Sequence, residues 1–303
     1  MEKIAYKGWK TCYRLSNKVI DLVVTGDVGP RIIRLGFVDG PNEFAEFTEM
    51  LGLTGGDEWR IYGGHRLWHA PEIPPRTTAP DNAPITAEEH AGCVRFIQPV
   101  EAITGIQKEL DVTLDPGEAH VTVVHRLRNT NLWTIELAPW ALSVMAQGGK
   151  AIIPLPPRGT HGENLLSSSS ITLWAYSDMS DRRWSWGTRY VMLQQEPGND
   201  KPQKAGFWVP DGWVAYARDG CLFVKTFTPD ARACYPDRGC SVEVFTNDRM
   251  LEVETLGPMI YLEPGADIEH VEHWFLFSAV PAPENASDVE AYVMPKIEAV
   301  KGA

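Results

Sequence analysis

Two carboxyl groups one residue apart, Glu252 and Glu254, have the spacing in this sequence that points most directly to proton transfer. They lie in the segment LEVETLGP, in which apolar and polar residues alternate. A period of two predicts a β-strand that turns both carboxyl groups to one face and Val253 to the other. Because two neighbouring carboxylates are costly to bury in ionised form, we expect one of them to have a raised pKa, as a general base needs. A polar strand face that pairs with neighbouring strands explains the same pattern.

The segment GGHRLWHAPE, residues 63–72, combines aromatic, basic and acidic side chains and is expected to lie in a long loop. The flat face of Trp68 matches the C–H face of a sugar ring, and the guanidinium of Arg66 offers a fixed set of donors. We therefore expect a polar-ligand site, with a buried structural turn as an equal alternative. A zinc site is not expected, because two histidines at this spacing align only on a helix, which the flanking glycines and proline oppose. The candidate ligand-binding residues here are His65, Arg66, Trp68, His69 and Glu72.

A second loop, PPRGTHGEN, contains His161 between a basic and an acidic residue. An imidazole in such a loop can exchange protons with a ligand near neutral pH. The turn-rich segment that follows contains Asp178 and Arg183 among tryptophans, a combination found in carbohydrate sites and also in ordinary salt-bridged loops.

The segment IEHVEHW alternates polar and apolar residues near the C-terminus. On a strand, His270 and Glu272 share one face and His273 lies on the other. His270 and Glu272 therefore join the candidate ligand-binding residues, and cross-strand pairing is again the structural alternative.

The elements that must position these residues are predicted to be strands. Apolar segments are short, alternate with period two and are bounded by turn residues, as in IDLVVT and RIIRLGF around GDVGP. WVAYAR and CLFVKTF flank Asp219-Gly220, a strong hairpin signal. Helical pattern is confined to residues 286–300, where Ser287 is a candidate cap and Pro295 a break. We expect one all-β domain over residues 1–303, an antiparallel sandwich with long irregular stretches at 41–91 and 154–170, and this excludes α/β nucleotide-binding folds.

Charge and composition narrow the classes of partner. With 28 basic and 40 acidic residues the net charge is -12, which disfavours nucleic acid and anionic membranes. The five cysteines form no CxxC pair, so reduced thiols are expected. No apolar stretch is long enough for a signal peptide or a membrane span, and a cytoplasmic protein is expected.

The segment GCSVEVFTNDRMLEVETLGPMIYLEPGADIEHVEHW resembles the C-terminal part of the galactose mutarotase-like (aldose 1-epimerase) superfamily. There, a strand with Glu-Thr precedes a proline-bearing turn, a Leu-x-Pro-Gly sequence and a strand of alternating polar residues. The opening LVVTGDVGPRIIRLGF resembles the start of that superfamily. As a set, GGHRLWHAPE, PRGTHGENLL, WAYSDMSDRRW and DGWVAYARDGCLFVKTF resemble an uncharacterised branch of it, the DUF4380-type proteins.

The resemblance implies a large β-sandwich of the supersandwich type, with a sugar cleft on one sheet. It implies anomer exchange on a sugar, with Glu254 as the general base and neither metal nor cofactor. Mutarotases have an Asn-His-x-x-Phe-Asn type signature on a middle strand, whereas this chain has PWALSVM at residues 139–145 and no histidine there. His161 lies roughly where a second family histidine would fall and is the candidate acid.

Three alternatives remain at this stage. A lyase or isomerase acting on uronic acids or polysaccharides would use Arg66 or Arg183 to hold a carboxylate. A sugar-binding protein without activity would bind and not turn over its ligand. A cupin-like metal site is suggested by Pro264-Gly265 followed by His270 and Glu272, although cupins have a second histidine in the place of this glutamate.

Overall fold

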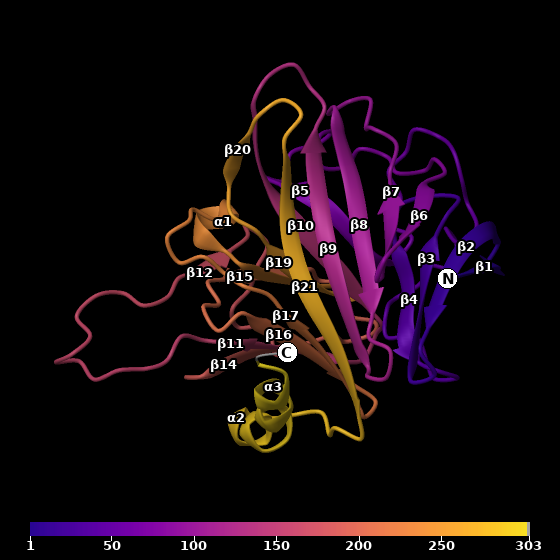
Figure 1. Cartoon of the computed structure of the whole chain (residues 1–303). Coiled ribbons are helices and arrows are strands. Elements are labelled where there is room, and N and C mark those ends of the chain that lie inside the picture. Colours follow the sequence, from indigo (N-terminus) through magenta and orange to yellow (C-terminus); the bar gives the residue numbers. More distant parts are fainter. Residues whose placement is uncertain (302–303) are drawn as a thin grey trace.

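The computed structural model describes residues 1–301 and consists of two large antiparallel β-sheets packed face to face (Figure 1). The first sheet has 11 strands and begins with the N-terminal meander. Its strand order is β1 (Glu2–Tyr6), β2 (Trp9–Ser16), β3 (Ile20–Thr25), β4 (Ile32–Phe37), β5 (Gly64–Ala70), β10 (Ile135–Met145), β19 (Leu251–Leu256), β18 (Val242–Thr246), β15 (Gln203–Phe207) and β12 (Ile171–Leu173), with β20 (Ile260–Leu262) paired to the start of β10.

The second sheet has 10 strands and lies in front of the first in Figure 1. Its strand order is β13 (Trp184–Trp186), β14 (Tyr190–Gln194), β11 (Lys150–Pro154), β16 (Trp213–Arg218), β17 (Cys221–Thr226), β21 (Asp267–Ser278), β9 (His120–Asn129), β8 (Ile106–Leu114), β7 (Cys93–Ile97) and β6 (Thr86–His90). The all-β sandwich expected from the alternating segments is therefore confirmed.

The main hydrophobic core fills the space between the two sheets. Val253 of β19, Val244 of β18 and Val123 of β9 are among its fully buried side chains. Because alternate residues of a strand point to opposite faces, the residues between them point away from this core. Glu252, Glu254 and the rest of the outward-facing set thus lie on what we call the outer face of the 11-stranded sheet.

The turn between β16 and β17 shows how local sequence sets a strand register. Asp219 has φ of 49° and Gly220 has φ of 80°, so both central residues are left-handed, as a tight hairpin with right-handed strand twist requires. The turn pairs Arg218 with Cys221.

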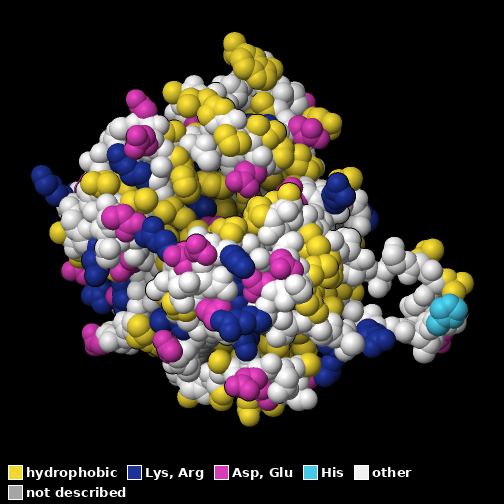
Figure 2. All heavy atoms as spheres, turned by 180° about the vertical axis from the view of Figure 1, so that it is seen from behind, with side chains coloured by type: hydrophobic (Ala, Val, Ile, Leu, Met, Phe, Trp, Pro, Cys, Tyr) yellow, Lys and Arg dark blue, Asp and Glu magenta, His cyan; other side chains and the backbone are white. Residues whose placement is uncertain are grey.

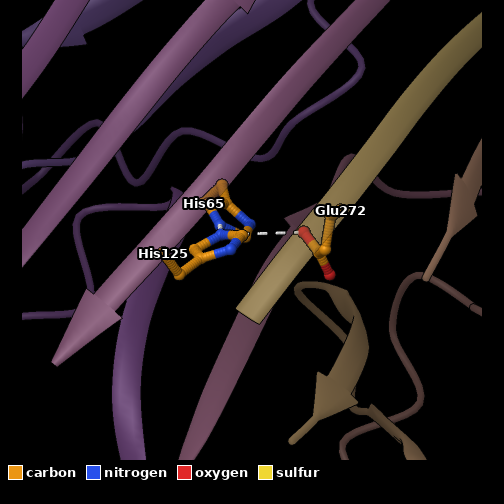
Figure 3. A group of neighbouring side chains, drawn as sticks. All are labelled: His65, His125 and Glu272. Atoms are coloured by element: carbon orange, nitrogen blue, oxygen red, sulfur yellow. Dashed lines mark hydrogen bonds and ion pairs between the residues drawn. The ribbon is translucent and has the colours of Figure 1, made fainter. Parts of the chain in front are cut away.

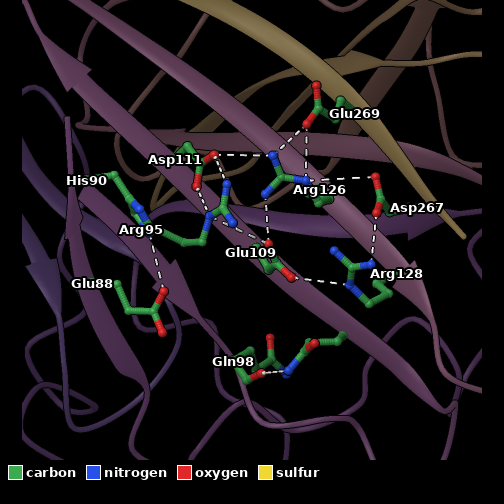
Figure 4. Close-up of polar contacts among 11 residues, drawn as sticks. Glu88, His90, Arg95, Gln98, Glu109, Asp111, Arg126, Arg128, Asp267 and Glu269 are labelled. Atoms are coloured by element: carbon green, nitrogen blue, oxygen red, sulfur yellow. Dashed lines mark hydrogen bonds and ion pairs between the residues drawn. The ribbon is translucent and has the colours of Figure 1, made fainter. Parts of the chain in front are cut away.

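The outward face of the 10-stranded sheet carries a ladder of ion pairs across β7, β8, β9 and β21 (Figure 4). Arg126 lies 2.7 Å from Glu109 and 3.2 Å from Asp111, and Arg95 lies 2.7 Å from Asp111. Arg128 and Asp267 extend the ladder at 2.9 Å. These residues occupy the polar positions of the alternating segments, so their charge pattern is explained by cross-strand pairing.

Two expectations about the elements need correction. Residues 64–70 form strand β5 and not a loop, and all seven are buried. A strand covered on both faces lacks the alternation by which strands are recognised. Gly63, with φ of 106°, makes the turn into it, where a Cβ atom would lie 2.0 Å from the carbonyl oxygen of Ala45.

The second correction concerns the C-terminal helical segment, which comprises α2 (Ala286–Asp288), the π-helical turn η1 (Val289–Val293) and α3 (Met294–Val300). Its cap is Asn285, whose side chain accepts from the amides of Ser287 and Asp288, and not Ser287 itself. Pro295 starts α3 instead of breaking the segment, because the first turn of a helix needs no amide donor there. Val289, Val293 and Ile297 pack on the outward face of the 10-stranded sheet.

The remaining helix, α1 (Pro236–Gly239), is a single turn. No helix among residues 1–301 is long and apolar enough to cross a membrane. The stretch between β11 and β12 is irregular, as expected, and projects away from the two sheets (Figure 1).

Candidate functional site

A cluster of charged residues lies on the outer face of the 11-stranded sheet, in the middle of its strand order. The register brings Arg66 of β5, Leu142 of β10, Glu254 of β19 and Glu243 of β18 into one row across four strands. Alternation places Glu252 of β19 and Lys204 of β15 on the same face, in the next row of outward-facing residues. We call these five charged residues the outer cluster: Arg66, Lys204, Glu243, Glu252 and Glu254.

Two ion-pair systems hold the outer cluster together. Arg66 Nη2 donates to Glu252 Oε1 at 2.9 Å. Lys204 Nζ lies 2.8 Å from Glu243 Oε2 and 3.2 Å from Glu254 Oε2, so one ammonium serves two carboxyl groups. Trp140 Nε1 donates to the same Glu254 oxygen at 2.8 Å.

Aromatic side chains surround this cluster. Trp59, Trp68 and Trp140 form a row of tilted and edge contacts with ring centroids 5.5 and 5.4 Å apart. Lys204 Nζ lies 4.7 Å from the ring centroids of both Trp140 and Trp174. Figure 2, which views the molecule from the side of this sheet, shows a hollow surrounded by hydrophobic side chains with charged side chains at its floor. Aromatic faces beside fixed polar groups suit the mixed apolar and hydroxylated surface of a sugar.

Several polar atoms of this region are buried without a hydrogen-bond partner among the described residues. They are Glu254 Oε1, Glu243 Oε1, Arg66 Nε and Nη1, and Trp59 Nε1, whereas Glu243 Oε2 contacts Lys204 Nζ. Buried polar groups in proteins are nearly always paired, so a concentration of unpaired donors and acceptors on one face marks the place where a polar ligand can bind.

Burial changes the protonation of the outer cluster. Loss of solvent raises the pKa of Glu254, an effect that the Lys204 ammonium opposes and that the neighbouring Glu252 carboxylate reinforces. Burial raises the pKa of Glu243 well above its usual value, with Lys204 opposing and Glu254 and Asp237 reinforcing the change. Burial alone would lower the pKa of Lys204, but Glu254 and Glu243 outweigh it and raise the pKa. The cluster thus combines a firmly held cation with carboxyl groups poised for proton transfer.

A second polar group, the inner cluster, lies between the sheets, beneath the outer one. Thr255 Oγ1 donates to Glu272 Oε1 at 2.5 Å and lies 2.7 Å from His270 Nε2. Lys225 Nζ donates to Glu272 at 2.9 Å, and Lys225 and Glu272 are completely buried. The inner cluster consists of His65, His125, Ser143, Lys225, Thr255, His270 and Glu272.

The two histidines His65 and His125 face each other in this inner cluster, with the Glu272 carboxylate beside them (Figure 3). His125 Nδ1 lies 2.8 Å from the carbonyl oxygen of His270, so its N–H donates there and its Nε2 is an acceptor. His65 Nε2 lies 2.7 Å from that acceptor and donates to it, which leaves His65 Nδ1 to accept from the hydroxyl of Ser143 at 2.8 Å. Burial lowers the pKa of both imidazoles, in agreement with these neutral tautomers.

His65, His125 and Glu272 are also a group whose ligand atoms all lie within 4.8 Å of one another. Two imidazoles and a carboxylate form a donor set that zinc accepts. An ion at this place would break the His65–His125 hydrogen bond and lie beside the Lys225 ammonium, which already neutralises Glu272. The residues therefore fit a hydrogen-bonded core better than a metal centre.

The structure distributes the residues singled out in the sequence over several places, and not over one face. Arg66, Trp68, Glu252 and Glu254 share the outer face. His65, His270 and Glu272 belong to the inner cluster, because strand alternation turns them to the core. His69 is also buried on the inward side, 4.0 Å from Glu101, whereas His273 points outward and contacts His120.

The loop candidates are not members of the outer cluster. His161 is exposed in the projecting stretch between β11 and β12, so the structure does not bring it to Glu254. Asp178 is exposed and accepts from Ser180. Arg183 is bound by Asp181 and by the carbonyl oxygen of Lys201, and Glu72 is exposed just beyond β5.

Sequence reasoning missed Lys204, Glu243 and Trp140 as members of this site. A signal existed for Glu243: the segments CSVEVFT and MLEVETL form a hairpin, and counting outward from its turn pairs Glu243 with Glu254. Lys204 had no such signal, because β15 and β18 are distant in the sequence and become neighbours only in the folded sheet.

A surface cavity of about 870 Å³ lies elsewhere, lined by residues such as Gly52, Gly55, Pro80 and Pro84. Glycine, proline and alanine dominate its walls, and it holds no cluster comparable to that around Glu254. We therefore place the candidate site on the chemistry of the outer cluster and not on the size of this cavity.

No protein-family model matches the sequence, and no curated protein matches it either. Solved structures do match the fold. The protein Slr1438 from Synechocystis sp. PCC 6803 has a TM-score of 0.58 at 10% identity, with 92% of this chain and 100% of that chain covered. A galactose mutarotase-like protein from Lactobacillus casei has a TM-score of 0.58 at 9% identity, covering 88% of this chain and 100% of that one.

A galactose mutarotase related enzyme from Lactobacillus acidophilus has a TM-score of 0.52 at 13% identity, with 90% and 100% coverage. The molecule therefore has the galactose mutarotase-like fold, and the resemblance seen in the sequence is confirmed at the level of the fold.

Proposed function

We propose that this protein is a carbohydrate-active isomerase that interconverts the anomers of an aldose, with Glu254 as the general base. The observation that carries the proposal is the state of the Glu254 carboxyl group. One oxygen is fixed by Trp140 and Lys204, while Oε1 is buried beside aromatic side chains without a partner among residues 1–301. A base needs one such free oxygen on a rigidly held carboxylate. The mutarotase names of the fold neighbours support the substrate class.

Anomer exchange requires a base to take the proton of the C1 hydroxyl and an acid to protonate the ring oxygen. The ring then opens, the aldehyde rotates and the ring closes again. Burial raises the pKa of Glu254, which makes its carboxylate a stronger base than one in water. Neither a metal nor a redox cofactor takes part in this scheme.

Sugar contacts are proposed for Arg66 and Trp68, which share the outer face with Glu254. The guanidinium of Arg66 lies 4.4 Å from the Trp68 ring centroid, and its Nε and Nη1, which have no hydrogen-bond partner among residues 1–301, can donate to hydroxyl groups. His65, His270 and Glu272 support β5, β19 and β21 from the core side, so their contribution to the site is structural. Asp178 and Glu72 are exposed and would contact a sugar only if it extended beyond the outer cluster. His69 and Arg183 are buried and are not proposed as sugar contacts.

The test compares wild-type protein with Glu254→Gln on D-glucose and D-galactose, using polarimetry or NMR exchange. The substitution keeps shape and hydrogen bonding and removes the base, so turnover is expected to fall about 10²–10⁴-fold while sugar affinity stays within a few-fold. Glu89→Gln, an exposed carboxyl on β6, is the matched control and should keep the wild-type rate. Equal rates for wild type and Glu254→Gln on a converted sugar would remove Glu254 from the mechanism.

Two other functions use the same site. The free Nε and Nη1 of Arg66 favour an anionic sugar such as a uronic acid, for which a lyase reaction would give an unsaturated product with new ultraviolet absorbance. A sugar-binding protein without activity would bind an aldose in both wild-type and Glu254→Gln forms and show no exchange in either. The polarimetric and absorbance measurements separate these outcomes.

A further inference from the structure

Glu243 is held in the outer cluster by a single partner, Lys204. It lies directly opposite Glu254 across the β18–β19 pair and opposite Gly206 of β15. Gly206 has no side chain, and the place of a Cβ atom there is taken by Cys240 Sγ, which would lie 2.4 Å from it, with Glu243 Cγ at 3.4 Å. The carboxyl group of Glu243 is completely buried: Oε2 lies 2.8 Å from Lys204 Nζ, and Oε1 has no hydrogen-bond partner among the described residues.

The outer cluster has more acidic than basic groups. Its three carboxyl groups, Glu243, Glu252 and Glu254, face only two cations, Arg66 and Lys204. Arg66 neutralises Glu252, which leaves two carboxyl groups for one ammonium. Because all of these groups are buried, an uncompensated negative charge is costly, and one additional bound proton relieves it.

Hydrogen bonding decides which carboxyl group holds that proton. Glu254 accepts from Trp140 Nε1 and Lys204 Nζ, and donors of this kind stabilise the ionised form. Glu243 has a single partner among the described residues, Lys204 Nζ at 2.8 Å, and lacks a second donor such as the Trp140 Nε1 that Glu254 has. The other titratable groups around it give no further stabilisation to its ionised form: Asp237 before β18 and Tyr176 after β12 are acidic groups, and the Cys240 thiol is buried.

We propose that Glu243 is protonated at neutral pH and is the general acid that complements Glu254. The inference rests on the proposed anomer exchange and supplies the acid that the scheme requires. Lys204 is not the acid, because the two carboxyl groups stabilise its charged form. Its role is to hold the two carboxyl groups next to each other. His161 is exposed on the projecting stretch.

The proton balance of the step is complete within the pair. Glu254 takes the proton of the C1 hydroxyl, the C1 carbonyl forms and the bond between C1 and the ring oxygen breaks. The electron pair of that bond goes to the ring oxygen, which takes the proton of Glu243. The open-chain aldehyde rotates about its C1–C2 bond. On closure the Glu254 proton goes to the aldehyde oxygen and the hydroxyl proton returns to Glu243, so each cycle restores both groups.

The extra proton is tested without any sugar by infrared spectroscopy of the whole protein at neutral pH. A protonated carboxyl group has a C=O stretching band separate from that of carboxylates. The wild-type protein is expected to show the band, and Glu243→Gln is expected to lose it. Glu254→Gln should lose it as well, because two carboxyl groups then face two cations. Glu89→Gln is the matched control and should keep it. A wild-type spectrum without the band overturns the proposal, whatever the protein does with sugars.

The assignment of the two roles is tested by the pH profile of kcat/KM on the aldose that the wild type converts. Glu243→Gln is expected to lower kcat about 10²–10⁴-fold and to remove the alkaline limb of the profile, whereas Glu254→Gln removes the acidic limb. An unchanged alkaline limb in Glu243→Gln, at an unfolding midpoint equal to wild type, overturns the acid role. If no aldose is converted, the proposed function and this acid role both fail, while the infrared result still decides whether Glu243 holds the proton.

Discussion

Glu254 and Thr255 are consecutive residues of β19 and belong to two polar clusters on opposite faces of one sheet. Glu254 accepts from Trp140 on the outer face, and Thr255 joins Glu272 and His270 in the core. Hydrogen bonds on the core side of β19 thus fix the strand that carries the candidate base. Changes to the inner cluster should therefore affect stability, and changes to the outer cluster should affect protonation and turnover.

Replacement of Trp140 by phenylalanine tests the hydrogen bond to the candidate base. Trp140→Phe keeps an aromatic ring and removes the Nε1 donor that lies 2.8 Å from Glu254 Oε2. Because that donor stabilises the carboxylate, the pKa of Glu254 should rise further and the acidic limb of kcat/KM should move to higher pH. Trp9→Phe, which removes a donor to the carbonyl of Leu53 far along the sheet, should leave the profile unchanged.

Replacement of Lys225 tests the ion pair in the core. Lys225 and Glu272 are both completely buried, so Lys225→Met leaves an uncompensated buried carboxylate. We expect a loss of about 3–5 kcal/mol in the free energy of unfolding, measured with urea. The double variant Lys225→Met with Glu272→Gln should regain part of the loss, because it removes both charges. A double variant that is less stable than the single one contradicts this account.

The hydroxyl group of Thr255 is tested with two substitutions. Thr255→Val removes the donor to Glu272 and the acceptor for His270 at nearly constant volume. The free energy of unfolding should fall by about 1–3 kcal/mol, because buried polar groups lose a partner. Thr255→Ser keeps the hydroxyl and should retain most of the stability. Equal losses for both variants would attribute the effect to packing.

The inner cluster also predicts how stability depends on pH. Burial lowers the pKa of His270 to about 3, although Glu272 opposes the change. Burial alone would raise the pKa of Glu272, but Lys225 and the neighbouring histidines lower it to about 2. In the unfolded chain both groups bind protons at higher pH than in the folded protein, so the unfolded state holds more protons in the acidic range.

The free energy of unfolding should therefore decrease from near pH 6.5 down to about pH 3 through His270, and from about pH 4.5 to about pH 2 through Glu272. Urea unfolding across this range measures the slope. His270→Gln should flatten the upper part, and a slope identical to wild type would show that His270 does not contribute.

His161 provides a test of the projecting stretch. His161 is exposed and lies on a segment that the structure does not fold over Glu254. His161→Ala should leave kcat and its pH profile close to wild type on any converted aldose. A large loss of kcat with unchanged stability would show that this stretch closes over the site during turnover and would return the acid role to His161.

The sequence alone determined most of the strands and the turns between them. The segments IDLVVT, HVTVVHRLRN and WVAYAR coincide with β3, β9 and β16, because alternation and turn chemistry are local properties. Strand β5 was hidden, because its segment GHRLWHA mixes polar and apolar residues on both faces and so has no alternation to recognise. Local pattern also placed Glu252 and Glu254 on a common strand face.

Tertiary structure alone decided which distant side chains meet on the face that carries Glu252 and Glu254. Lys204 reaches Glu254 because β15 and β18 are neighbours in the sheet, and Arg66 reaches Glu252 through β10. The face on which a histidine lies depends on the register of its strand, since a shift of one residue reverses every side chain. For that reason His270 was recognisable as a polar strand residue from the sequence, whereas its position in the core and the pairing of Glu243 with Lys204 followed only from the packed sheets.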